Sequence, residues 1–192
     1  MGKTPVNRAL GELRGKIDDY VFRNLEGETV VARRPRPLKV PPTASQLAVQ
    51  ERFRQAGKYA KAVLRDPARK QPYLDFAEES GVSNRRLFGV IARDYLQPPE
   101  ILNIDTTYYK RVVGGEIHVM AKDDVLVTGV TLKLTRHADG SLIEEGPATY
   151  YGPYWRYVAT AVAPPAGELI DIEVIATDLA KNRTIERMGL MT

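Results

Sequence analysis

The sequence predicts an α+β protein in two parts: an N-terminal β-hairpin with short helices, followed by a C-terminal β-sandwich. Two observations favour this fold class. Helical spacing of apolar residues dominates the first half of the chain, whereas β-branched residues alternate with polar ones in the second. The pattern changes at "YLQPPEI", residues 95–101, where Pro98 and Pro99 end a helix because the residue before a proline avoids the α conformation. We therefore expect two domains, residues 1–98 and 99–192.

The first forty residues predict a hairpin joined to a proline-rich segment. "DYVFRNL" and "ETVVARR" alternate apolar and polar residues around a turn at Glu26-Gly27. A lone hairpin is marginally stable in water, so this one needs a surface to pack on. It runs into "ARRPRPLKVPP", residues 32–42, which we call the basic strap because prolines keep it extended. Its basic side chains are Arg33, Arg34, Arg36 and Lys39.

A strong helix is predicted over residues 43–66. Thr43 or Ser45 can cap its N-terminus by accepting a hydrogen bond from a backbone N–H. Apolar residues recur at steps of three and four, so we expect one face to be buried. That face consists of Leu47, Phe53, Ala56, Ala60, Val63 and Leu64.

Two shorter helices follow. Residues 67–81 predict a helix that is interrupted at Pro72 and ended by the glycine at its last position, a favourable C-cap. Residues 84–96 predict a third helix with Ser83 or its neighbour as the cap. The apolar stripe of this helix consists of Leu87, Phe88, Ile91, Tyr95 and Leu96.

The second half predicts seven short strands separated by turn signals such as "VGG", "ADG" and "PPAG". Short, evenly punctuated strands are typical of a β-sandwich. The predicted strands are residues 103–110, 115–122, 125–136, 141–148, 153–161, 168–177 and 183–190.

Several motifs in these strands resemble bacterial immunoglobulin-like domains. They are "EIHVMAKDD", "VTGVTLKL", "DGSLIEEGPA", "WRYVAT" and "IDIEVIATDLAKNRT", all after Asn103. Lys181 stands in the last motif where such domains usually have glycine. The resemblance implies an immunoglobulin-like β-sandwich, with Trp155 as a core anchor. It implies little about function, because this fold serves many roles.

The first half is similar to a pattern in uncharacterised bacterial and phage-associated proteins built in two parts. "GKIDDYVFRN" and "ARRPRPLKVPPTASQLAVQERF" carry this similarity. It implies a structural or assembly role without a defined activity.

Charge is distributed unevenly along the chain. Residues 1–96 hold 19 Lys and Arg against 11 Asp and Glu, a balance of +8, whereas residues 97–192 hold 9 against 13, a balance of −4. The asymmetry allows the basic strap to contact the acidic half of another copy or a protein partner. It also allows contact with nucleic acid phosphates, although the strap lacks the aromatic residues on which bases stack.

The densest aromatic cluster is "TYYGPYWRY", residues 149–157. One interpretation places Trp155 in the core and treats its neighbours as turn residues. The other is an exposed contact surface, because tyrosine and arginine are enriched at binding hot spots. The candidate contact residues are Tyr150, Tyr151, Tyr154 and Arg156.

Catalytic chemistry finds little support. The chain has no cysteine and two histidines, His118 and His137, and it lacks a glycine-rich phosphate loop. His118 is expected on the solvent side of its strand, and His137 in a turn. Glu144 and Glu145 are adjacent in a strand, so their side chains point to opposite faces and cannot act as an acid–base pair. We expect no enzymatic activity, no cofactor and no small-molecule substrate.

Three aspartates at predicted strand ends raise the question of a metal site. Asp123, Asp124 and Asp178 carry the oxygen ligands that calcium prefers. Acidic residues in turns more often accept hydrogen bonds from nearby backbone N–H groups, and no complete calcium-loop motif is present. The sequence alone therefore favours the local role and predicts no metal.

The sequence as a whole predicts a non-enzymatic structural and interaction protein. We expect a component of a larger homo- or hetero-oligomeric assembly, such as a phage-like particle, that docks through the basic hairpin and strap. A nucleic-acid-binding protein is the alternative. No apolar run is long enough to span a membrane and no signal peptide is evident, so the expected location is the cytoplasm or a particle assembled there.

Overall fold

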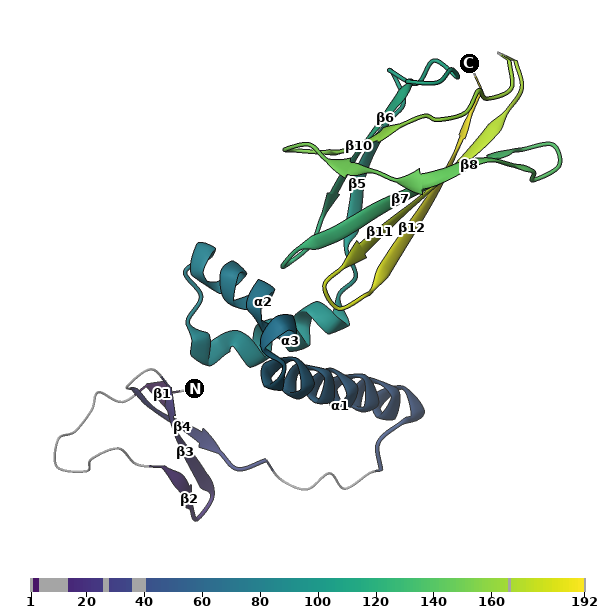
Figure 1. Ribbon diagram of the computed structural model, residues 1–192. Helices are drawn as coiled ribbons and strands as arrows, with labels where there is room; N and C mark the ends of the chain where they lie inside the picture. Colours follow the sequence, from purple (N-terminus) through teal and green to yellow (C-terminus); the bar gives the residue numbers. More distant parts are fainter. Residues whose placement is uncertain (1, 4–13, 26–27, 36–40, 166, 192) are drawn as a thin grey trace. The chain divides into compact units, whose positions relative to one another are not determined.

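The computed structural model describes residues 2–3, 14–25, 28–35, 41–165 and 167–191 (Figure 1). It has a β-rich α+β fold, with three α-helices and three four-stranded antiparallel sheets in these ranges. The chain divides into two compact units, residues 1–44 and 45–192. The helices and the C-terminal strands thus share the second unit, and the expected boundary at residues 98 and 99 lies inside it.

The first unit is a sheet with the strand order β1-β4-β3-β2. The predicted hairpin is confirmed: β3 (Tyr20–Leu25) pairs with β4 (Glu28–Arg33), while its turn at residues 26–27 lies outside the described residues. Two short strands that the pattern did not predict, β1 (Gly2–Lys3) and β2 (Gly15–Ile17), flank the hairpin. No side chain described in this sheet is buried.

Helix α1 (Ala44–Arg65) confirms the first predicted helix, but only part of its apolar face is buried. Ala56, Ala60 and Val63 are buried, whereas Leu47 is 52% and Phe53 63% exposed. The expectation that Leu47 and Phe53 would be buried was therefore wrong. Helical spacing identifies a face, but the hydrophobic cluster shared with the other helices reaches only the second half of α1.

Helix α2 (Pro67–Glu79) runs without a break through Pro72, so the predicted interruption was wrong. Pro72 lacks the N–H of one intrahelical hydrogen bond, and Asp66 anchors the first turn by accepting from two backbone N–H groups. The helix ends before Gly81, which has a φ of 65° and confirms the predicted C-cap.

Helix α3 (Leu87–Leu96) follows a short 3₁₀ turn, Asn84–Arg86, in which Ser83 accepts a hydrogen bond from the backbone N–H of Arg85. Leu87 and Ile91 are buried as expected, while Phe88 is 42% exposed. A residue that the apolar stripe did not include, Asp94, is fully buried on the same helix.

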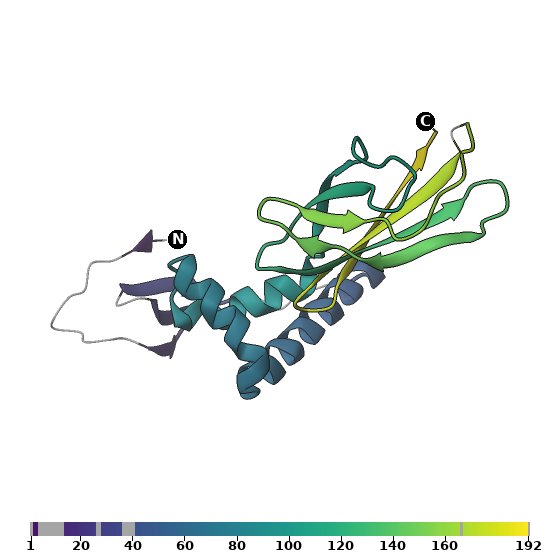
Figure 2. The ribbon, with the colours of Figure 1, turned by 45° about the horizontal axis from the view of Figure 1, so that its top comes forward.

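Two further sheets form the rest of the second unit, and we call residues 100–190 the two-sheet body (Figures 1 and 2). One sheet has the order β5-β6-β10-β9, with β5 Glu100–Asp105, β6 Glu116–Lys122, β10 Trp155–Val158 and β9 Thr149–Tyr150. The other has the order β12-β11-β7-β8, with β12 Arg183–Leu190, β11 Ile170–Asp178, β7 Val127–Arg136 and β8 Leu142–Pro147.

One predicted strand is displaced. The strand expected over residues 103–110 begins at Glu100, directly after the two prolines, and ends at Asp105. The Asp105 carboxylate accepts a hydrogen bond from the backbone N–H of Thr107 and so turns the chain away from the sheet.

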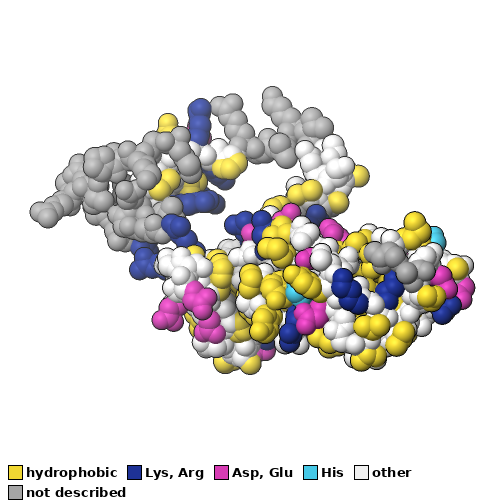
Figure 3. Space-filling view, turned by 90° about the horizontal axis from the view of Figure 1, so that it is seen from above, with side chains coloured by type: hydrophobic (Ala, Val, Ile, Leu, Met, Phe, Trp, Pro, Cys, Tyr) yellow, Lys and Arg dark blue, Asp and Glu magenta, His cyan; other side chains and the backbone are white. Residues whose placement is uncertain are grey.

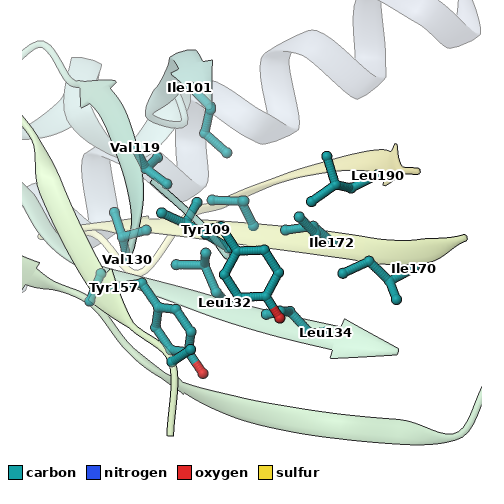
Figure 4. Packing of buried hydrophobic residues seen from close by; sticks show 14 of the residues in the cluster. Ile101, Tyr109, Val119, Val130, Leu132, Leu134, Tyr157, Ile170, Ile172 and Leu190 are labelled. Atoms are coloured by element: carbon teal, nitrogen blue, oxygen red, sulfur yellow. The ribbon is translucent and has the colours of Figure 1, made fainter. Parts of the chain in front are cut away.

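Both sheets contribute to one hydrophobic core (Figure 4). Every second residue of β11 is buried, from Ile170 to Asp178, and these side chains pack with β7 residues such as Leu132. From the other sheet come Ile117, Val119 and Tyr157 among others, so the two sheets pack face to face.

A buried arginine fastens the end of the two-sheet body that lies away from the helices. Arg111, at a φ of 57°, donates hydrogen bonds through its guanidinium to four backbone carbonyls. The acceptors are the carbonyl oxygens of Pro164, Pro165, Glu168 and Leu190, at 2.9–3.0 Å. One side chain thus ties a loop to the C-terminal strand.

None of the helices in the ranges described here is long and apolar enough to cross a membrane.

Candidate functional sites

An ordered row of rings lies on the outward face of the β5-β6-β10-β9 sheet. In the register of β6 and β10, His118 lies opposite Arg156. The ring of Tyr154 stacks on His118 at a centroid distance of 4.3 Å, and the ring centroid of Tyr108 lies 5.2 Å from that of His118. We call Tyr108, His118, Tyr151, Tyr154 and Arg156 the aromatic surface.

Charged groups hold this row in place. The Arg156 guanidinium lies 4.7 Å from the ring centroid of Tyr151 and 3.5 Å from a carboxylate oxygen of Glu116. The other Glu116 oxygen lies 2.8 Å from His118 Nε2. Tyr108 and Tyr151 remain 57% and 56% exposed, so the surface presents large rings to solvent on a rigid support.

The aromatic surface differs from the set that the sequence suggested. The structure brings Tyr151, Tyr154 and Arg156 together, but Tyr150 pairs across strands with Trp155, which packs against the core. His118 lies on the outward face as expected, yet its side chain is only 16% exposed because the tyrosines cover it. The pairing of β6 with β10 could not be read from either segment alone.

The basic strap is only partly described. Arg33 lies 3.8 Å from Asp19 in an exposed ion pair, and the Arg34 backbone N–H donates to the Asp19 carbonyl. Arg36 and Lys39 lie outside the described residues. Figure 3 shows the Lys and Arg side chains of the described residues and draws the other residues in grey. The strap as a joint contact site stays a prediction.

Glu144 has a local structural role. Its side chain is buried, and one carboxylate oxygen accepts hydrogen bonds from the Thr160 backbone N–H, the Thr160 hydroxyl and the Ala161 backbone N–H. Glu145 is exposed, in agreement with the predicted alternation. His137 forms an exposed contact of 2.9 Å with Asp171. Glu144 therefore holds a loop, and it lies on the opposite face of β8 from Glu145.

Among the described residues, three aspartates are close enough together to hold a metal ion. One carboxylate oxygen from each of Asp94, Asp123 and Asp178 lies within 4.8 Å of the others. Burial raises the pKa of Asp94 to about 7, with Asp178 and Asp123 adding to the effect and the Tyr73 hydroxyl opposing it. Burial also raises the pKa of Asp178, while hydrogen bonds from Asn182 act in the opposite direction.

Sequence reasoning found two of these three residues. Asp124, the third candidate, instead pairs with Arg93 at 2.9 Å. Asp94 was missed, although a signal existed: it follows Leu87 by seven residues and Ile91 by three, which places a carboxylate on the apolar stripe of α3.

No protein-family model matches this chain, and no curated protein matches it significantly.

Proposed function

We propose that this protein is a non-enzymatic structural component of a larger assembly, such as a phage-like particle, in which copies of the chain contact one another. The aromatic surface of one copy receives a neighbour, and the basic N-terminal segment docks on a neighbour's acidic half. The charge balances of +8 and −4 in the two halves favour head-to-tail contact between copies.

We also propose that the two-sheet body is an immunoglobulin-like β-sandwich. The order of its strands supports this assignment. Along the chain, β5, β6, β7, β8, β9, β10, β11 and β12 correspond to strands A, B, C, C′, D, E, F and G, so the two sheets have the orders A-B-E-D and G-F-C-C′. Immunoglobulin domains arrange their strands in the same way. Such a framework carries contact residues on a rigid support, and the fold itself leaves their role open.

The aromatic surface is the observation that carries the proposal. Tyrosine provides large, rigid contact area at a low cost in side-chain entropy, and both tyrosine and arginine are enriched at the centres of protein interfaces. Here the rings are already stacked on one another and the arginine is already paired with Glu116. Binding would therefore order few additional groups.

Sedimentation velocity of the full chain over a concentration series tests this function. We expect the wild-type chain to form larger species as its concentration rises. Replacing Tyr151→Ala together with Arg156→Ala should abolish them while leaving circular dichroism and the unfolding midpoint nearly unchanged. Tyr150→Ala is the matched control, because Tyr150 is 63% exposed and lies outside the aromatic surface.

The basic strap is tested in the same measurement. Association should weaken in a triple variant that carries Arg33→Gln, Arg34→Gln and Arg36→Gln. The control variant carries Lys58→Gln, Lys61→Gln and Arg65→Gln, which remove equal charge from the exposed side of α1, and its association should be unchanged. A wild-type chain that stays monomeric at every concentration contradicts the proposal. Duplex DNA binding that falls steeply with salt and is lost in the strap variant favours the nucleic-acid alternative instead.

A glycan screen tests whether the tyrosines bind carbohydrate.

A further inference from the structure

Three elements meet where the helices join the two-sheet body, and each contributes one aspartate. Asp94 lies in the last turn of α3, Asp123 in the turn between β6 and β7, and Asp178 at the end of β11. Figures 1 and 2 show the β11–β12 turn beside the helices. Asn182, in that turn, donates to the Asp94 backbone carbonyl at 2.8 Å, so the contact is direct.

The three carboxylates lack an ion-pair partner among the described residues. In the part of the chain that the structure describes, no lysine or arginine pairs with any of the three carboxylates. Asp94 and Asp178 have no exposed surface. Burying neighbouring carboxylates without a positive partner is strongly unfavourable, because each loses hydration and repels the others.

One buried oxygen in the cluster accepts from no N–H or hydroxyl group among the described residues. Asp94 Oδ2 accepts from the Tyr73 hydroxyl at 2.5 Å, whereas the buried Asp94 Oδ1 accepts from no donor. A buried polar atom without a partner costs free energy and calls for an explanation, such as a bound ion.

The other two carboxylates are fixed in orientation by neighbouring donors. Asp178 accepts from the backbone and side-chain N–H groups of Asn182 at 2.7 Å each, and Asp123 Oδ2 accepts from the backbone N–H of Val125 at 2.9 Å. Such hydrogen bonds hold metal-ligating carboxylates in place and preserve their negative charge.

We propose that Asp94, Asp123 and Asp178 bind a hard divalent cation, Ca²⁺ in preference to Mg²⁺. Ca²⁺ lies about 2.3–2.6 Å from its oxygen ligands, so two ligands of one ion can be up to about 5 Å apart. The oxygen separations of 4.8 Å or less satisfy this limit. The flexible coordination of Ca²⁺ suits ligands from three separate elements better than the strict octahedron of Mg²⁺.

Solvent can reach the site from one side. A surface groove is lined by Gln97, Glu100, Lys122, Asp123 and Asp124, among others, and Asp123 is partly exposed. Water entering there would complete the coordination shell. The ion would join α3 to the β6–β7 turn and to the end of β11, and so stabilise the junction between the helices and the two-sheet body.

Metal binding to the metal-free full chain tests the proposal directly. Tb³⁺, which occupies Ca²⁺ sites, should show luminescence on tyrosine excitation because Tyr73 is hydrogen-bonded to Asp94. Ca²⁺ should compete for the site with a dissociation constant in about the micromolar to millimolar range. Millimolar Ca²⁺ should also raise the melting temperature, and Mg²⁺ should raise it less.

Isosteric variants separate binding from folding. Asp94→Asn should weaken Ca²⁺ binding by about tenfold or more, yet its metal-free form should melt no lower than the metal-free wild type, because a buried charge is removed. Asp123→Asn, on the solvent side of the cluster, should weaken binding as well and serves if Asp94→Asn fails to fold. Asp124→Asn is the matched control, since Asp124 is the neighbour that pairs with Arg93.

Two results overturn the proposal. The first is equal Tb³⁺ luminescence in the wild type and both cluster variants. The second is a melting temperature that neither Ca²⁺ nor Mg²⁺ changes at any pH. In that case a proton, and not a metal ion, neutralises the cluster. Because burial raises the pKa of Asp94 to about 7, the folded protein would lose stability as the pH rises from about 4 to about 7, and Asp94→Asn would remove that loss.

Discussion

Two sheets of this protein have the same number of strands and the same antiparallel pairing, yet they differ in what they bury. In the C-terminal sheet β12-β11-β7-β8, the inner strand β11 buries alternate side chains completely, including Ile172 and Val174. In the N-terminal sheet β1-β4-β3-β2, the inner strand β4 has no described side chain that is buried, and Val31 is half-buried.

The difference shows that strand pairing alone does not make a stable sheet. Backbone hydrogen bonds largely replace bonds to water, so their net contribution is small, whereas apolar burial contributes about 25 cal/mol for each Å² removed from water. The C-terminal sheet obtains this burial from the sheet that faces it. The N-terminal sheet needs another surface, which is why we assign it a docking role.

The largest effect should come from one substitution made in both inner strands. Val174→Ala should lower the free energy of unfolding by about 2–3 kcal/mol, because it leaves a cavity in a closed core. Val31→Ala should lower it by less than about 1 kcal/mol, because its site is open to water. Urea unfolding followed by circular dichroism measures both. Equal losses would mean that the N-terminal sheet has a core of its own.

A smaller effect should distinguish the arginines of the two regions. Arg111→Lys should cost about 2 kcal/mol, since a single ammonium cannot serve four carbonyls that a planar guanidinium reaches. Arg33→Lys should leave stability unchanged, because its ion pair with Asp19 is exposed. Thermal melts of the two variants test this pair, and a stable Arg111→Lys protein would contradict the role assigned to Arg111.

The smallest effect concerns two turns. Lys181, in the turn between β11 and β12, has a φ of 69°, and Asp18 in the N-terminal sheet has a φ of 50°. Lys181→Gly should stabilise the protein by about 0.5–1 kcal/mol, because glycine adopts this conformation without strain. Asp18→Gly should gain less, since aspartate tolerates it better. Differential scanning calorimetry should resolve the two changes, and a loss in the Lys181 variant would show that the lysine side chain stabilises the turn.

Local patterns predicted most of the elements but not their contacts. Alternation predicted β11 and β12, and capping residues predicted α2 and α3, because these signals act over a few neighbouring residues. The burial of Leu47 and Phe53 was predicted wrongly, since periodicity marks an apolar face without showing what covers it.

The candidate sites illustrate the same limit. The sequence drew attention to Tyr151, Tyr154 and Arg156 through their density, but not to Tyr108 and His118, which lie more than thirty residues earlier. It also identified Asp123 and Asp178 without showing that they meet.

The sequence by itself determined the order and type of most elements, the uneven charge and the residue types available for contact. Only the tertiary structure decided which tyrosines stack, that Tyr150 turns toward Trp155, and that Asp94 joins two distant aspartates. The physical reason is range: propensity and capping act between neighbours in the chain, whereas strand register and packing join residues that only the folded chain brings together.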